Sequence, residues 1–279
     1  MISIITAIYN QLGMNMLYYE SLLHATDGEF ELIIVDNGST DDSAEFFESR
    51  GKNVKVIRNG GNYSYPYCQN IGIKNAKGDV LAFLNNDILL SPHWDTRIKT
   101  ILGKNGYEML SLCSNNRMPD AKEAKAANRR WKRIKNPLIF LLGARKQSLK
   151  LMAKLYYGKN FDEWCEEHWA RYGKALKPGF PACGSAVIMT RKGLQMIGGQ
   201  WDPTQQNADY DLYLQTKQLH DKGENIQPLS MVCGIYHHHF CRLTFNQKYP
   251  TYKDNDNLKS CEEKWGDELM KQTIDELKK

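Results

Sequence analysis

Blocks of apolar and polar residues alternate along the first third of the chain and predict strands and helices in turn. Short β-rich runs lie at Ile2–Ile8, Phe30–Val35, Val54–Ile57 and Val80–Leu84, and helical patterns lie between them at Met14–Ala25, Asp42–Glu48 and Tyr67–Asn75. Alternation of this kind predicts an α/β fold with a mostly parallel sheet and helices on both faces.

Polar residues follow three of these predicted strands directly. They are Tyr9-Asn10, Asp36-Asn37-Gly38-Ser39 and Asn85-Asn86-Asp87. In open α/β sheets, ligands bind beyond the carboxyl ends of the strands. We therefore expect the three polar groups to face one crevice.

The pattern changes after about Arg117. A stretch rich in lysine and arginine is followed by one rich in aromatic and acidic residues, which together predict a helical insertion at residues 117–180. Strands are predicted again at Ala186–Thr190 and Met231–Tyr236, with a helix at Asp211–His220 between them, so residues 1–116 and 181–258 form the two halves of one domain. Residues 259–279 are predicted to form a closing helix.

Composition narrows the class of protein. The chain has 279 residues of which 42% are apolar, which is enough for a substantial core. An odd number of cysteines, seven, without a CxxC pair argues against a complete disulfide framework and favours a reducing compartment. The amino-terminal sequence lacks the features of a signal peptide, and no apolar run approaches the length of a membrane span. We expect a cytoplasmic protein that is at most peripheral to a membrane.

Six segments, taken in order, resemble glycosyltransferase family 2, whose members have the GT-A fold. They are SIITAIYN, ELIIVDNGSTDDS, the span from Asn62 to Asn70-Ile71-Gly72, AFLNNDILLSPHW, GSAVIMTRKGLQMIGGQWD and NADYDLYLQ. The resemblance covers roughly half of the chain. It implies a Rossmann-like sheet whose residues 1–116 bind a nucleotide sugar, with a UDP-sugar as the expected donor, and whose residues 181–258 hold the acceptor and catalytic side. It also implies a metal-dependent enzyme that transfers the sugar to a hydroxyl acceptor with inversion.

The donor site is expected at the first strand ends. A carboxylate at Asp36 can accept hydrogen bonds from a base or ribose, and the resemblance implies that it binds the nucleobase. The alternative is that Asp36 and Ser39 only build a turn and cap the next helix. Further donor contacts are expected at Thr6, Ala7, Tyr9, Asn10, Asn62 and Asn70.

The metal site is expected at Asn85-Asn86-Asp87, where the family has an Asp-x-Asp motif. Mn²⁺ and Mg²⁺ prefer oxygen ligands, so Asp87 is the expected carboxylate ligand, and Asn85 and Asn86 are expected to touch ribose or sugar hydroxyls. A plain strand-end turn is the alternative. In an extended chain His237 and His239 point to the same side, and the resemblance implies that one of them completes the metal site. Otherwise the histidines are an exposed or core-satisfied run.

An inverting transferase needs a carboxylate that takes the proton from the acceptor hydroxyl. The resemblance places this base at Asp209, with Asp211 as the second candidate, although Asp211 is equally well placed to cap a helix. On the acceptor side, Gly184 and Ser185 are expected to shape the crevice. Trp201 is expected either to stack on a sugar or to pack in the core.

The segment Ala121–Lys154 holds eleven Lys or Arg residues and one acid, Glu123, within a chain of net charge +5. Arg129 and Arg130 are therefore acceptor-side candidates. The segment is interpreted as a solvated helical face, as a surface for anionic lipid, which would suit a lipid-linked glycan acceptor, or as a groove for DNA in which Trp131 or a tyrosine stacks on a base.

Two other functions fit parts of the pattern. Acids are missing beside Asp87 and Asp209, which would suit a non-catalytic nucleotide- or glycan-binding module of the same fold. A nucleotidyltransferase would use a related sheet. It would be expected to carry a Gly-rich, Arg- and Lys-bearing loop after the first strand, which Tyr9-Asn10-Gln11-Leu12-Gly13 does not provide.

Overall fold

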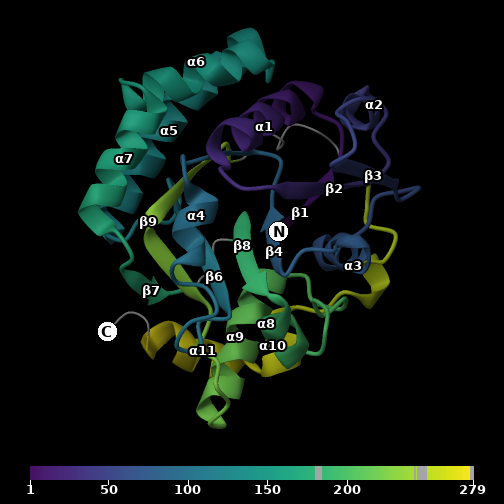
Figure 1. Cartoon of the computed structure of the whole chain (residues 1–279), viewed down its shortest axis with the longest axis vertical. Helices are drawn as coiled ribbons and strands as arrows, with labels where there is room; N and C mark the ends of the chain where they lie inside the picture. The colour runs from purple at the N-terminus through teal and green to yellow at the C-terminus, as the bar shows by residue number, and fades with distance from the viewer. Residues whose placement is uncertain (180–183, 242, 244–249, 277–279) are drawn as a thin grey trace.

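The computed structural model describes residues 1–179, 184–241, 243 and 250–276, and in it a twisted sheet is flanked by helices (Figure 1). Its strands are β1 (Ile2–Ile8), β2 (Phe30–Asp36), β3 (Val54–Arg58), β4 (Val80–Leu84), β5 (Ile88–Leu90), β6 (Met109–Ser114), β7 (Leu176–Pro178), β8 (Ala186–Thr190) and β9 (Ser230–His239). The strand order is β3-β2-β1-β4-β8-β6-β9-β5, with β7 paired to β9.

Helices connect the strands and close the chain. They are α1 (Leu12–Ala25), α2 (Ser43–Glu48), α3 (Tyr65–Asn75), α4 (Trp94–Lys99), α5 (Ala121–Leu142), α6 (Lys146–Tyr157), α7 (Phe161–Tyr172), α8 (Arg191–Met196), α9 (Ala208–Asp221), α10 (Cys261–Trp265) and α11 (Asp267–Glu276), with a 3-10 turn η1 (Asn255–Asn257). The helical insertion predicted for residues 117–180 contains α5, α6 and α7, and strand β7 follows them within the same range. The predicted closing helix is divided into α10 and α11.

The α/β class is confirmed, and the sheet is wholly parallel only in its first half, although β6 also pairs with β9 in parallel. Strands β1 to β4 pair in parallel, whereas β8 runs antiparallel to both β4 and β6, and β5 runs antiparallel to β9. The sheet is therefore mixed beyond β4. Strand β1 has β2 on one side and β4 on the other. The order in which successive strands are added to the sheet therefore reverses at β1. Crevices for ligands form at such switch points, at the carboxyl ends of the strands.

Several predicted boundaries differ from those observed. Strand β9 continues through the three histidines to His239, because the backbone of His237–His239 pairs with β5. Helix α9 begins at Ala208, three residues before the predicted start, and so includes Asp209. Strands β5, β6 and β7 were not predicted. All three are short, and the serines of β6 are buried within the sheet, which conceals its apolar pattern.

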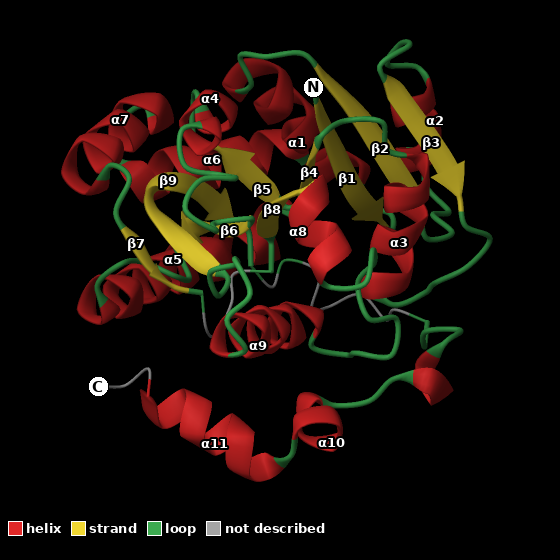
Figure 2. Cartoon of the chain, turned by 60° about the horizontal axis from the view of Figure 1, so that its bottom comes forward, coloured by secondary structure: helices red, strands yellow, loops and turns green. Residues whose placement is uncertain are grey.

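Apolar side chains fill both faces of the sheet, and a third apolar cluster lies under the insertion. Figure 2 shows α9, α10 and α11 together below the sheet in that view. Helices α1, α2 and α4 contribute to the cluster on one face, and α3, α8, α9, α10 and α11 to the cluster on the other. The third cluster joins α5, α6 and α7 to α1 and β9 around Trp131, which is 2% exposed. The insertion is thus anchored to the sheet, and the buried Trp131 is not available to stack on a nucleic-acid base.

The described cysteines are free thiols, five of them buried and Cys241 partly exposed. Cys183 lies outside the described residues. Among the helices that the structure describes, none is both long enough and apolar enough to cross a bilayer.

Candidate active site

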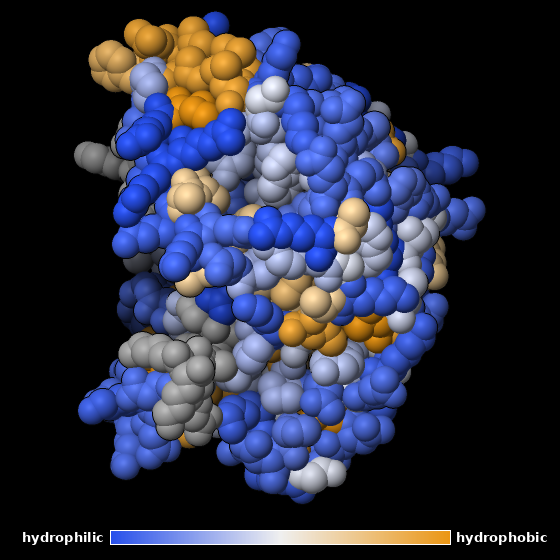
Figure 3. Space-filling view, turned by 90° about the vertical axis from the view of Figure 1, so that its left-hand side faces the viewer, coloured by the Kyte–Doolittle hydropathy of each residue, from blue (hydrophilic) through white to orange (hydrophobic). Residues whose placement is uncertain are grey.

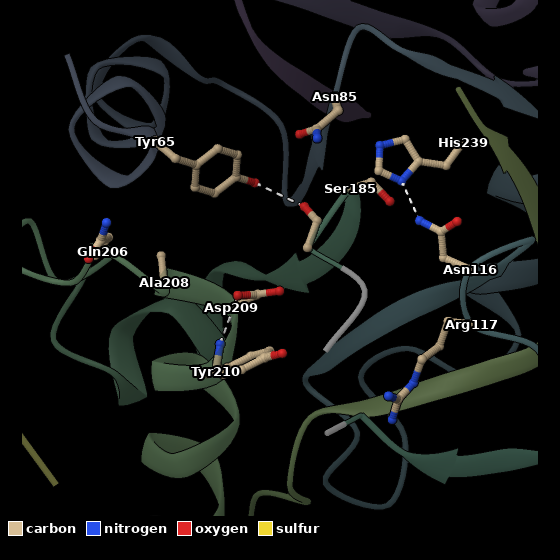
Figure 4. A pocket seen from close by; sticks show the side chains of 11 residues that line it. Tyr65, Asn85, Asn116, Arg117, Ser185, Gln206, Ala208, Asp209, Tyr210 and His239 are labelled. Atoms are coloured by element: carbon tan, nitrogen blue, oxygen red, sulfur yellow. Dashed lines mark hydrogen bonds between the residues drawn. The ribbon is translucent and has the colours of Figure 1, made fainter. Parts of the chain in front are cut away.

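Two adjoining cavities lie at the carboxyl ends of β1, β2 and β4. The first, of about 290 Å³, lies between these strand ends and the start of α3. The second, of about 460 Å³, lies between the end of β9, the turn before β8 and the start of α9 (Figure 4). Tyr65 and Asn85 line both. We call them the strand-end cavity and the Asp209 cavity.

The strand-end cavity is rich in amide side chains. Of the residues expected to bind a donor, it is lined by Ala7, Tyr9, Asn62, Asn85 and Asn86. Asn37 also lines it, and its amide is fixed by a bond to the carbonyl of Tyr63 at 2.9 Å and by one from Asn59 at 3.0 Å. Amides donate and accept hydrogen bonds without a charge, which suits hydroxyl groups and the edges of nucleobases.

The other expected donor residues lie behind this wall. Asp36 is 2% exposed, and its Oδ1 accepts the backbone N–H of Ser39 at 3.1 Å. Thr6 is buried and shares a hydrogen bond with the Tyr18 hydroxyl. Asn10 accepts the backbone N–H of Thr40 at 2.7 Å and so ties the end of β1 to the loop after β2. Asn70 is bonded in both directions to the backbone of Trp201. These contacts brace the cavity wall.

Asp87 and His239 meet between the two cavities. His239 Nε2 lies 3.2 Å from Asp87 Oδ2, and each side chain is less than one-fifth exposed. Burial opposes the charged forms, but the Asp87 carboxylate raises the pKa of His239 well above its usual value, and His239 lowers the pKa of Asp87. Asp87 Oδ1 is buried and has no hydrogen-bond partner among the described residues. An unpaired carboxylate oxygen beside an imidazole fits a cation.

The described residues supply no third His, Cys, Asp or Glu to this pair. His237 lies on the same side of β9 as His239, as the alternation predicted, with ring centroids 6.3 Å apart. Its Nε2 is 2.7 Å from the Ser185 hydroxyl, and burial lowers the pKa of His237 well below its usual value. His238 points the other way, toward Tyr157. Any cation at Asp87 would therefore take most of its ligands from a bound molecule.

Asp209 lies in the wall of the second cavity, in the first turn of α9 (Figure 4). Its Oδ1 accepts the backbone N–H of Tyr210 at 3.0 Å, and the carboxylate also accepts a backbone hydrogen bond from Gly184. A Cβ on Gly184 would lie 2.8 Å from Oδ2, so this position leaves room only for glycine. Burial raises the pKa of Asp209 and outweighs these hydrogen bonds and the nearby charge of Arg117. A carboxylate with a raised pKa at a cavity wall suits a general base.

Asp211 is engaged elsewhere. It is 1% exposed, and its Oδ1 lies 2.7 Å from both the Trp265 indole nitrogen and Lys264 Nζ. Its Oδ2 accepts the side-chain amide of Gln215. Asp211 thus joins α9 to α10, and it lines neither cavity.

The expected acceptor residues separate into three places. Gly184 and Ser185 line the Asp209 cavity. Trp201 is 2% exposed and packs edge-on against Tyr65 and Phe83, so its contacts are those of a core residue. Arg129 and Arg130 lie on the exposed side of α5, outside both cavities.

Six residues that line the Asp209 cavity were not predicted, among them Tyr65, Asn116 and Arg117. Tyr65 is partly buried, and its hydroxyl donates to the Gly184 carbonyl at 3.5 Å. Asn116 donates to His239 Nδ1 at 3.2 Å, and Arg117 extends from the same turn (Figure 4). Asn116 and Arg117 directly follow β6. The rule that located the other strand ends would have found them had β6 been predicted.

Comparison with known sequences relates the chain to glycosyltransferases. The model of glycosyl transferase family 2 matches residues 3–154. An uncharacterized glycosyltransferase of Rickettsia felis is 40% identical over 90 residues, which are 32% of this chain and 15% of that protein. The undecaprenyl-phosphate 4-deoxy-4-formamido-L-arabinose transferase of Pseudomonas savastanoi pv. phaseolicola is 30% identical over 128 residues, which are 43% and 37% of the two chains. The chain thus spans less than two-fifths of either relative.

Solved structures of low sequence identity share the fold. A mannosyltransferase from Pyrobaculum calidifontis, in complex with GDP-Man and Mn²⁺, has a TM-score of 0.56 at 9% identity, over 89% of this chain and 58% of that one. Residues 1–349 of S. aureus TarS, in complex with UDP, have a TM-score of 0.52 at 14% identity, over 85% and 60%. The GT-A architecture expected from the sequence is confirmed.

Proposed function

The chain belongs to glycosyl transferase family 2, and we propose that it transfers a sugar from a nucleoside diphosphate, with UDP as the preferred nucleotide, to a hydroxyl acceptor with inversion. One observation carries the proposal. The Asp209 carboxylate, with its raised pKa, faces a cavity that adjoins the strand ends where the amides and Asp87 gather. A donor and a base can therefore share one site.

The donor lies in the strand-end cavity under this proposal. Tyr9, Asn37 and Asn62 supply the aromatic and amide groups for the nucleoside, and Asn85 and Asn86 supply hydrogen bonds to ribose and sugar hydroxyls. Asp36 is 2% exposed, and under this proposal its carboxylate holds the loop after β2 beside the nucleoside through the Ser39 N–H. The sugar then extends past Asn85 into the Asp209 cavity, because this residue lines both spaces.

Asp87 and His239 would hold a divalent cation, Mn²⁺ or Mg²⁺, with His237 as a further candidate behind Ser185. The unpaired Asp87 Oδ1 supports this assignment. When bound, such an ion neutralises the charge that develops on a leaving diphosphate. With few protein ligands in place, the donor diphosphate would supply much of the coordination, so we expect the ion and the nucleotide to bind together.

Asp209 acts as the base in this proposal. Its carboxylate takes the proton of the acceptor hydroxyl while the hydroxyl oxygen forms a bond to the anomeric carbon. The bond between that carbon and the diphosphate oxygen breaks, and the nucleoside diphosphate leaves with the electron pair. Burial favours proton uptake by Asp209, and the Gly184 and Tyr210 backbone groups hold the carboxylate in place.

The acceptor approaches from the far side of Asp209. A third cavity of about 630 Å³ shares Asn116, Arg117 and Tyr210 with the Asp209 cavity. Its remaining wall is largely apolar, with Met118, Met231, Met270 and Ile274 among its residues, and it also holds one cation, Lys177, and one acid, Glu262. This lining suits an acceptor that carries an apolar portion beside its hydroxyl.

A panel of nucleoside diphosphates and nucleotide sugars, tested by thermal shift with and without Mn²⁺, examines the donor half of the proposal. A ligand at 100 times its Kd stabilises the folded state by about 2.7 kcal/mol. Release of nucleoside diphosphate from the stabilising donor then tests the enzymatic half. Binding without release would favour the non-catalytic module, and stabilisation by no nucleotide would refute both.

A further inference from the structure

Five apolar side chains are exposed on the hairpin of α5 and α6, three at the end of α5 and two within α6. Phe140 is 88% exposed, Leu141 71% and Leu142 45%, and Leu151 and Leu155 on α6 are 39% and 49% exposed. We call these five residues the hairpin tip. An apolar patch gathers at the top of this face of the molecule, with strongly hydrophilic residues beside and below it (Figure 3). Exposed apolar patches of this kind mark interaction sites.

The structure explains why the tip is not part of the core. Trp131, Leu149 and Met152 point from α5 and α6 into the third apolar cluster and anchor the hairpin. Leu151 and Leu155 are one helical turn apart and lie on the opposite side of α6. The hairpin therefore has two apolar faces, one buried against the protein and one open.

Cations surround the tip. Arg129, Lys132, Arg133, Arg145 and Lys154 are exposed, and no carboxylate lies within 4 Å of any of them in the described part of the chain. The neighbouring Lys146 and Lys150 differ, since both pair with Glu20 of α1. Within the hairpin, the exposed cations without a carboxylate partner in the described part of the chain thus share the outer side with the exposed apolar residues.

We propose that the hairpin tip binds the surface of an anionic lipid bilayer, with its apolar side chains in the interface and the surrounding cations at the headgroup phosphates. Apolar groups gain free energy at the boundary of the acyl chains, and each Lys or Arg near an anionic surface adds to the attraction. A bilayer offers both an apolar interior and a layer of negative charge. The hairpin presents the matching pair of features.

Two other occupants match less well. Nucleic acid would neutralise the cations but would leave Phe140, Leu141 and Leu142 in water, and the buried Trp131 is not available to stack on a base. A second copy of the chain would cover the apolar residues but would bring two sets of unpaired cations together, and like charges repel. Only the bilayer satisfies both the apolar residues and the cations.

Flotation of the full chain with lipid vesicles tests the proposal. We expect binding to vesicles of phosphatidylcholine with about one-third phosphatidylglycerol, little binding to pure phosphatidylcholine, and weakening at high salt because the headgroup attraction is screened. Equal binding to both lipids, or binding to neither, would overturn it. So would tighter binding to duplex DNA than to the anionic vesicles.

Two variants locate the surface. The triple change Phe140→Ser, Leu141→Ser and Leu142→Ser is expected to weaken vesicle binding at least tenfold, whereas Leu269→Ser, an exposed leucine on α11, is expected to leave it unchanged. Replacing Lys132, Arg133 and Arg145 by Gln is expected to weaken it by about a hundredfold. The matched control replaces Lys52, Lys222 and Lys271, which are exposed outside the hairpin, by Gln. It should change vesicle binding by less than about threefold.

Circular dichroism melting of each variant separates loss of binding from loss of folding, because all the replaced side chains are exposed. Unchanged vesicle binding in the serine variant would overturn the proposal. A concentration-dependent dimer of the wild type that the serine variant abolishes would instead assign the tip to a second copy. Vesicle binding does not depend on sugar transfer, so this result and the nucleotide measurements can fail separately.

Discussion

Asp211 and Asp209 lie two residues apart, but Asp211 holds α9 to α10 whereas Asp209 faces a cavity. The substitution Asp211→Ala tests this difference, because it should lower stability and leave turnover largely unchanged. Asp211→Ala removes the acceptor for the Trp265 indole, the Lys264 ammonium and the Gln215 amide at a site that is 1% exposed. The indole N–H of the partly buried Trp265 then loses its partner, which costs about 1–3 kcal/mol. Lys264 is 26% exposed at its side chain, so its ion pair adds only about 1 kcal/mol.

The expected loss in the free energy of unfolding is therefore about 3 kcal/mol, which corresponds to roughly 5 °C in the melting midpoint of a chain of this size. Asp221→Ala is the matched control, because it removes an exposed ion pair with Lys217 on the same helix and should change the free energy of unfolding by less than about 1 kcal/mol. Chemical and thermal unfolding followed by circular dichroism measure both.

Turnover of Asp211→Ala, measured well below its melting midpoint, is expected to stay within about tenfold of wild type, since the side chain lines neither cavity. A variant that melts like wild type but loses turnover by more than a hundredfold would refute this reasoning. It would identify Asp211 as the base. A double-mutant cycle with Lys264→Met would add the coupling between α9 and α10 directly.

Three further predictions concern the site itself. Burial raises the pKa of Asp209, so kcat/KM is expected to fall tenfold per pH unit below a midpoint that lies above the ordinary value of 3.8, in a profile from pH 4 to 8; a midpoint at or below 3.8 would contradict it. Gly184→Ala places a Cβ 2.8 Å from Asp209 Oδ2, and we expect kcat to fall by about a hundredfold with little change in nucleotide affinity, as measured by steady-state kinetics and calorimetry. Asp87→Asn is expected to abolish the strengthening of nucleotide binding by Mn²⁺ in calorimetry; an unchanged metal effect would exclude Asp87 as a ligand.

The parts of the fold that could be predicted are those whose pattern is local. Buried apolar runs that end at a polar residue predicted the bounds of β1, β4 and β8. Strand β6 could not be predicted, since its serines are buried by neighbours distant in the sequence. The same applies to the site. Asp87 and Asp209 belong to recognisable motifs, whereas Tyr65 and Arg117 reach the Asp209 cavity only through the packing of α3 and β6.

The predicted contacts at Asn70 and Asp211 show the same limit. Both residues are polar and lie in or next to a family motif. Sequence alone does not distinguish a side chain that contacts a ligand from one that holds the fold together. In the folded chain Asn70 is bonded to the backbone of Trp201, 131 residues away, and Asp211 to Trp265, 54 residues away. Long-range partners of this kind leave no spacing in the sequence.

The central claim, that Asp209 is the base of a sugar transfer, is tested most directly by comparing Asp209→Asn with wild type in a single-turnover assay on the donor identified by thermal shift. General-base catalysis contributes about a hundredfold to ten-thousandfold. We predict a rate loss of that size with nucleotide affinity within about threefold of wild type, because Asp209 lies outside the strand-end cavity. A variant that transfers the sugar at the wild-type rate would contradict the claim.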